Sequence, residues 1–101
     1  MIPEPIKIVA EDNFDLVVHF ADGKIFKVNF KEFIGDSVKS NAVKNSLAVF
    51  KTAEIEDGLS INWSNGFSLD PDVVYTEGEA VSNLKATASF ISIVKDKYSV
   101  R

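Results

Sequence analysis

The sequence predicts an α+β fold, in which hairpins and a meander form a mostly antiparallel sheet beside one short helix and a C-terminal helix. A chain of 101 residues is long enough for one hydrophobic core but not for two. Short runs of alternating apolar and polar residues are separated by Asp-Gly or Asn-Gly pairs, which is typical of hairpins. After Gly78, apolar residues recur every three or four positions, as on one face of a helix.

Composition and charge narrow the classes of function. Hydrophobic residues make up 46% of the chain and charged residues 26%, as in ordinary globular proteins. The net charge of −4 argues against a nucleic-acid binder acting on its own and against a membrane-surface module, because both need a basic face. The absence of cysteine excludes disulfides and thiolate metal sites. No apolar run approaches the roughly 18 residues of a membrane span. The N-terminus lacks signal-peptide features, so we expect a cytoplasmic protein.

The first third of the chain predicts three strands. Residues 6–10 form a short strand with Ile6 and Ile8 on one face, after a proline-flanked start. Residues 14–20 alternate most clearly, and residues 25–30 carry a second alternating set.

The turn between the second and third strands follows from burial. A two-residue turn would pair Val18 with Lys27 and place a lysine on the apolar face. A three-residue loop, Ala21-Asp22-Gly23, avoids this and needs a left-handed third residue, which glycine supplies. This register pairs Val18 with Phe26, Leu16 with Val28 and Phe14 with Phe30.

Residues 31–52 give weaker signals. We expect Phe33 and Ile34 to be buried and Lys39-Ser40-Asn41 to form a loop. Asn45 or Ser46 could cap a short helix that runs through residue 51, and the sequence also permits an earlier start.

Residues 53–69 predict a three-stranded meander with the same turn chemistry. A loop at Glu56-Asp57-Gly58 would pair Ile55 with Leu59 and Ala53 with Ile61. A loop at Ser64-Asn65-Gly66 would pair Trp63 with Phe67 and Ile61 with Leu69. Together with the first hairpins, this meander predicts one antiparallel sheet with a helix packed on it.

The remainder of the chain begins with a helix signal. Asp70 is a good N-cap and Pro71 suits the first helical position, so residues 72–75 should form a helical turn. The periodicity after Gly78 favours a helix, although the β-branched run at residues 89–94 would also suit a strand.

Two motifs carry a resemblance to known proteins. The first is Phe20-Ala21-Asp22-Gly23, and the second is a closing pattern made of Trp63, Asn65, Gly66, Leu69, Pro71, Asp72 and Tyr75. Together they resemble the motifs of a widespread family of small bacterial domains of unknown function. The resemblance implies an α+β domain over residues 1–76 and a bacterial source. Some relatives carry an added helix-turn-helix, and others are encoded near toxin–antitoxin-like genes. The short family members lack residues 77–101, which we expect to form an extension that packs on the domain or on a partner.

Four residues are candidates for binding a ligand or partner. Trp63 and Tyr75 could line a groove, Asn65 with Gly66 could present backbone groups to a partner, and Asp72 lies in an acidic run. Each also has a structural interpretation, as core, edge cover, turn or helix start. No catalytic signature, metal-binding pattern or cofactor motif is present, so we expect no catalytic residue, metal or cofactor.

Two functions of different classes follow. The first is a small non-enzymatic protein-interaction or regulatory module, which open sheet edges would allow to form a homodimer. The alternative is a small-ligand-binding or enzymatic domain with a pocket near Trp63 and Tyr75. A pocket that brought His19 together with two of Asp70, Asp72 and Tyr75 would favour the alternative.

Overall fold

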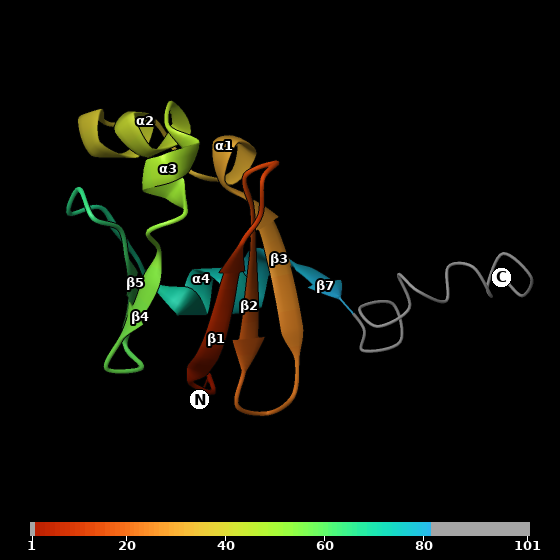
Figure 1. Cartoon of the computed structure of the whole chain (residues 1–101). Helices are drawn as coiled ribbons and strands as arrows, with labels where there is room; N and C mark the ends of the chain where they lie inside the picture. The colour runs from red at the N-terminus through yellow and green to blue at the C-terminus, as the bar shows by residue number, and fades with distance from the viewer. Residues whose placement is uncertain (1, 82–101) are drawn as a thin grey trace, which may run out of the picture.

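A computed structural model describes residues 2–81 as seven strands and four short helices (Figure 1). In order along the chain, these are β1 (Pro5–Ala10), β2 (Asp15–Phe20), β3 (Ile25–Asn29), α1 (Phe30–Phe33), α2 (Val38–Lys44), α3 (Leu47–Phe50), β4 (Glu54–Glu56), β5 (Ser60–Asn62), β6 (Ser68–Leu69), α4 (Pro71–Glu77) and β7 (Glu79–Val81). Most of the predicted C-terminal helix, residues 82–101, lies outside the described residues.

The predicted α+β class is confirmed, but the strands form two sheets instead of one. One antiparallel sheet has the order β1-β2-β3-β7, and a smaller antiparallel sheet has the order β4-β5-β6. The edge strands β1 and β4 contact each other, and α4 packs against β3 (Figure 1). No helix within residues 2–81 is long and apolar enough to cross a membrane.

The predicted register of β2 and β3 is confirmed. Leu16 pairs with Val28 and Val18 with Phe26, and the amide of Phe30 donates to the carbonyl of Phe14 at 2.8 Å. Gly23 has φ +90°, the left-handed conformation that the three-residue loop requires.

The same turn occurs three times, at residues 11–15, 20–24 and 63–67. In each turn, the backbone carbonyl of the residue before the loop accepts from the amide of the third loop residue. The amide of that same residue before the loop donates to the carbonyl of the residue after the loop. In all three turns, the side-chain oxygen of the middle loop residue (Asn13, Asp22 or Asn65) accepts from the backbone amide of the residue after the loop, at 2.9 to 3.1 Å. The third loop residues are left-handed: Gly23, Gly66 and, unusually, Phe14 with φ +71°.

Packing explains why a phenylalanine takes a position suited to glycine. The Phe14 ring centre lies 4.9 Å from that of Phe50, and the Nζ of Lys31 lies 4.3 Å from the Phe14 ring centre. These contacts offset the backbone strain. As a result the strand expected from residue 14 begins at Asp15.

Replacing Gly23 with alanine is expected to lower the free energy of unfolding by about 1 to 2 kcal/mol, because a side chain is disfavoured in the left-handed region. An added Cβ would meet nothing within 4 Å, so the effect isolates backbone conformation. Urea unfolding measures it. Asn tolerates this conformation, so Gly23→Asn should cost less, and equal losses for the two variants would contradict this explanation.

The predicted register of β4 and β5 is wrong by two residues. Ile55 pairs with Ile61 instead of Leu59. Asp57 and Gly58 both have positive φ, +53° and +68°, as the central residues of a type I′ turn require. The amide of Leu59 closes this turn by donating to the carbonyl of Glu56 at 3.0 Å, and the Leu59 side chain is left 74% exposed. In contrast, the predicted pairing of Ile61 with Leu69 is confirmed.

The first strand also departs from its predicted face pattern. Pro5 pairs with Phe20 and Lys7 with His19, so Ile6 forms a bulge between them. The Ile6 side chain is 64% exposed and does not share a buried face with Ile8, contrary to the prediction.

The helices between the sheets were only partly predicted. Lys39, Ser40 and Asn41 belong to α2 and not to a loop, because the Oγ of Ser37 caps that helix by accepting from the amide of Ser40 at 3.0 Å. Ser40 is fully buried, and its Oγ donates to the carbonyl of Gly35 at 2.7 Å. Phe33 and Ile34, which we expected to be buried, are half-buried.

Two other helix starts agree with the sequence. The Oγ of Ser46 accepts from the amide of Val49 at 3.2 Å and caps α3, one of the two predicted starts. The carboxylate of Asp70 accepts from the amide of Asp72 at 3.0 Å, and Pro71 begins α4. After α4, residues 79–81 form β7 and not the start of a helix.

One core joins the two sheets and the helices. It is formed by buried side chains from every layer, namely Leu16, Val18, Phe20, Val28, Phe30, Val43, Phe50, Ile61, Trp63 and Val74. The aromatic content of the chain is concentrated here, because Phe rings and the indole bury large areas.

Candidate functional site

Trp63, the first predicted binding residue, lies in the core and is 3% exposed. Its indole N–H donates to the carbonyl of Phe50 at 3.0 Å. Its ring centre lies 5.2 Å from that of Phe30 and 5.5 Å from that of Phe67. Both the hydrophobic surface and the polar atom of this side chain are therefore engaged inside the domain.

Tyr75 packs at a different place. Its ring centre lies 4.9 Å from that of Phe20 and 4.8 Å from that of Phe26. Its hydroxyl donates to the carboxylate of Asp22 at 2.6 Å, and the Nζ of Lys24 lies 5.9 Å from the ring centre. Tyr75 therefore connects α4 to the turn between β2 and β3.

The hydrogen bond shifts both titrations. Donation by Tyr75, followed by the backbone amide of Lys24, lowers the pKa of Asp22 below its ordinary value of 3.8. The Asp22 carboxylate, followed by partial burial, raises the pKa of Tyr75 above its ordinary value of 10.0.

Replacing Tyr75 with phenylalanine is expected to move the pKa of Asp22 back up toward 3.8, because the donor to its carboxylate is lost. A carboxyl whose pKa is lower in the folded state stabilises that state above the unfolded pKa. The stability difference between the wild type and Tyr75→Phe should therefore shrink as the pH falls through the folded pKa of Asp22. Carboxyl carbon NMR titration and urea unfolding at several pH values measure both effects. A difference independent of acidic pH would contradict the assignment.

Asn65 and Asp72 have local roles. The Asn65 amide donates to the carbonyl of Lys39 at 3.0 Å and accepts from the amide of Phe67 at 3.1 Å, so it ties the hairpin tip to α2. Asp72 is exposed in the first turn of α4, where a negative charge favours the helix.

The structure does not bring the four predicted residues together. Trp63 and Tyr75 share no aromatic partner. His19 lies on β2, paired with Ile25. Neither of the two hollows described below includes His19, Asp70, Asp72 or Tyr75.

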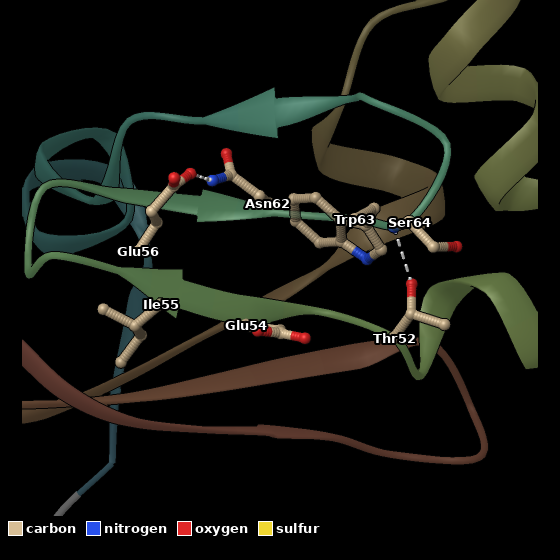
Figure 2. Close-up of a pocket in the computed structure, with 7 residues that line it drawn as sticks. All are labelled: Thr52, Glu54, Ile55, Glu56, Asn62, Trp63 and Ser64. Carbon is tan, nitrogen blue, oxygen red and sulfur yellow. Dashed lines mark hydrogen bonds between the residues drawn. The ribbon is translucent and has the colours of Figure 1, made fainter.

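A hollow of about 510 Å³ lies on the β4–β5 hairpin (Figure 2). It is lined by Thr52, Glu54, Ile55, Glu56, Asn62, Trp63 and Ser64. Its lining combines carboxylates, hydroxyls and an amide with apolar surface. Thr52 accepts from the amide of Ser64 at 2.9 Å, and the Asn62 amide donates to the Glu56 carboxylate.

The exposed area continues from this hollow along the β4–β5 hairpin to the start of β1. An added Cβ on Gly58 would lie 3.3 Å from the Oε1 of Glu4, so the start of β1 lies beside the β4–β5 turn. The exposed aliphatic residues Ile6 and Leu59 flank this contact in sequence. We use the name hairpin surface for Glu4, Ile6, Glu54, Ile55, Glu56 and Leu59.

The hairpin surface is acidic. Glu4, Glu54, Glu56 and the neighbouring Asp57 are exposed, and none forms an ion pair within residues 2–81. Lys7 is the basic residue on the adjacent part of β1. Sequence reasoning singled out Trp63 but missed these acids, although Glu54 and Glu56 at alternating positions on a strand must point to the same side.

A second hollow of about 260 Å³ lies between β3, α1 and the end of α4. It is lined by Lys27, Val28, Asn29, Glu32, Phe33, Glu77, Gly78 and Glu79. The Nζ of Lys27 lies 3.9 Å from Asp15 and 4.0 Å from Glu79, so its charge is compensated. In the part of the chain described here, no group of three or more His, Asp or Glu side chains could hold a metal ion.

Comparison with known proteins places the chain in a family without assigning it an activity. Neither the curated proteins nor the solved structures include a significant match. The model of the family described as "Protein of unknown function (DUF2442)" matches residues 5–80, which include every strand and helix described above except the last residue of β7. The chain therefore belongs to the DUF2442 family of proteins of unknown function.

Proposed function

We propose that the chain is a small protein-interaction or regulatory module that catalyses no reaction and binds its partner through the hairpin surface. The observation behind this proposal is the combination of exposed aliphatic side chains on the hairpin and on β1 with carboxylates that form no ion pair within residues 2–81. Ile6 and Leu59 are 64% and 74% exposed, which is costly for a surface that stays in water.

The charge of this surface indicates the kind of partner. Acidic groups around an aliphatic centre favour a partner segment that presents Lys or Arg beside apolar residues. Complementary charge would speed association, and aliphatic burial would supply affinity.

The absence of enzymatic activity is part of the proposal. The indole N–H of Trp63 and the hydroxyl of Tyr75 both bond within the domain. The sequence-based alternative of an enzymatic pocket places both residues at the pocket, with the Tyr75 hydroxyl among its polar groups. Their engagement supports a structural role for both residues.

One observation favours the alternative of a small-ligand site. The hollow of about 510 Å³ falls within the usual range for small-molecule pockets, and Trp63 lines it. Trp63 is the single tryptophan of the chain, so its fluorescence reports directly on binding there. Saturable fluorescence changes with a panel of metabolites would favour this alternative over the interaction module.

The interaction module is tested by charge reversal. Glu54→Lys with Glu56→Lys is expected to abolish capture of a partner that the immobilised wild-type chain retains, because two lysines would repel a basic segment. Affinity capture from the source cells at near-physiological salt, followed by mass spectrometry, measures the loss.

Glu11→Lys with Glu77→Lys is the matched control. It makes the same change in net charge at exposed positions outside the hairpin surface. A partner that both double variants lose equally would show non-specific charge attraction. A partner that the Glu54/Glu56 variant retains would contradict the assigned surface.

The family match does not test the bacterial source, the cytoplasmic location or the homodimer, so these stay predictions. Light scattering at high protein concentration tests the homodimer, and a monomeric mass would contradict it.

A further inference from the structure

We propose that the chain's own C-terminal segment, residues 82–101, binds the hairpin surface and competes there with the partner. The proposed competition rests on the interaction function described above, whereas binding of the segment to the surface does not. Three features identify this segment as the occupant: its basic charge, its apolar residues, and the position of Val81, where the described chain ends.

Charge divides the chain unequally. Residues 82–101 contain four basic side chains and one acidic side chain, whereas residues 1–81 contain fourteen acidic and seven basic side chains. The basic groups are Lys85, Lys95, Lys97 and Arg101. Attraction between the two parts is therefore favourable, and it is strongest where acids lack partners.

Acids without an ion pair lie close together on the hairpin surface and at the neighbouring Asp57. Elsewhere in residues 2–81, Asp12 pairs with Lys51, Asp36 with Lys44 at 3.0 Å, and Asp15 and Glu79 with Lys27. The other acids of that range that form no ion pair are spread over other turns and helices, namely Glu11, Asp22, Glu32, Asp70, Asp72 and Glu77. Glu4, Glu54, Glu56 and Asp57 form no such pair within that range, and the basic residue beside them is Lys7.

The apolar content of the segment also matches. Residues 90–94 read Phe-Ile-Ser-Ile-Val, directly before Lys95 and Lys97. An apolar run followed by two lysines complements a hollow lined by Ile55, Glu54 and Glu56, with the exposed Leu59 at the end of the adjoining turn.

The segment can reach this surface within one molecule. It leaves the fold at Val81 on β7, three strand spacings from β1, which amounts to about 15 Å. The stretch from Val81 to Lys95 can span about 45 Å. A tether of this kind gives an effective concentration in the millimolar range, so binding within one chain is favoured over binding between chains.

Zero-length carbodiimide crosslinking of the full chain tests the inference, because it joins a lysine amine to a carboxylate in contact with it. Mass spectrometry is expected to find Lys95 or Lys97 joined to Glu54 or Glu56. In a mixture of ¹⁴N- and ¹⁵N-labelled chains, each crosslinked peptide pair should have a single isotope composition. Pairs of mixed composition would overturn binding within one chain.

Two variants of the full chain complete the test. Lys95→Glu with Lys97→Glu should shift the amide NMR signals of residues 4–6 and 54–59. Lys31→Glu with Lys39→Glu, at exposed positions on α1 and α2, serves as the control and should leave those signals unchanged. Crosslinks to Glu11 as abundant as those to Glu54 and Glu56, or no shift at the hairpin surface, would overturn the inference. Partner capture is measured separately, so a segment that does not bind leaves the proposed interaction function intact.

Discussion

Replacing Trp63 with alanine is expected to lower the free energy of unfolding by about 3 to 5 kcal/mol, the usual cost of removing a buried tryptophan side chain. The variant loses contacts with Phe30 and Phe67 and leaves the carbonyl of Phe50 without its indole donor. Small domains have total stabilities of about 5 to 15 kcal/mol, so this loss removes a large share of the total. Urea unfolding followed by far-UV circular dichroism measures the loss without depending on tryptophan fluorescence.

Trp63→Phe separates packing from hydrogen bonding. This variant keeps an aromatic ring in the core but removes the indole N–H. It should cost about 1 kcal/mol for the lost hydrogen bond, because the amide of Ala53 still donates to the Phe50 carbonyl at 3.4 Å. A near-neutral Trp63→Ala variant would contradict the placement of this side chain in the core, and would revive Trp63 as a binding residue.

Gly78→Ala is the second large effect, although it adds only one methyl group. An added Cβ would lie 2.5 Å from the carbonyl oxygen of Val74 and 3.2 Å from the carbonyl oxygen of Lys27. Both obstacles are backbone atoms, one in α4 itself and one in β3. The chain at Gly78 would therefore have to change its path at the end of α4 and also move away from β3. Overpacking of this kind costs about 1 to 3 kcal/mol or more, and thermal or urea unfolding measures it.

Gly35→Ala is the matched control for this prediction. It makes the same chemical change where an added Cβ meets nothing within 4 Å. Its effect should stay within about 0.5 kcal/mol of zero. If both alanine variants were equally stable, the close approach of α4 to β3 would be wrong.

The elements that the sequence predicted correctly are those with local causes. The register of β2 and β3 follows from alternation and from Gly23, which lie within a few residues of one another. The start of α4 follows likewise from Asp70 and Pro71. In each case the residues that determine the structure are neighbours in the chain.

The wrong register at β4 and β5 shows where local patterns fail. The predicted hairpin paired Leu59 with Ile55 and placed Asp57 in the middle of a three-residue loop. In the structure Asp57 takes positive φ together with Gly58, and Leu59 is excluded from the sheet. Apolar character predicts burial only on average, so an exposed leucine misleads this reasoning.

The helix α2 was missed for a different reason. Lys39, Ser40 and Asn41 are polar, and serine and asparagine favour loops as readily as helices. Ser40 is buried because its hydroxyl reaches the carbonyl of Gly35. Asn29 was missed in the same way: its side chain caps α1 and also donates to Asp15 at 3.0 Å, on a neighbouring strand. Such tertiary partners cannot be identified from one sequence.

The candidate site was predicted in part. Trp63 does line the larger hollow, but as part of the core, and Tyr75 lies elsewhere. The acids and exposed aliphatic residues of the hairpin surface carry no recognisable motif. They become a surface only because β1 and β4 belong to different sheets and still contact each other.

The pairing of β7 with β3 has a consequence for the order of folding. Every other strand pair joins neighbours in sequence, whereas Ile25 pairs with Val81 at the far end of the described chain. Closing so long a loop costs more entropy than closing a hairpin, so we expect the hairpins to form first and β7 to dock last. By the same reasoning β7 should open first under native conditions, and its amide hydrogens should exchange with solvent before those of β2.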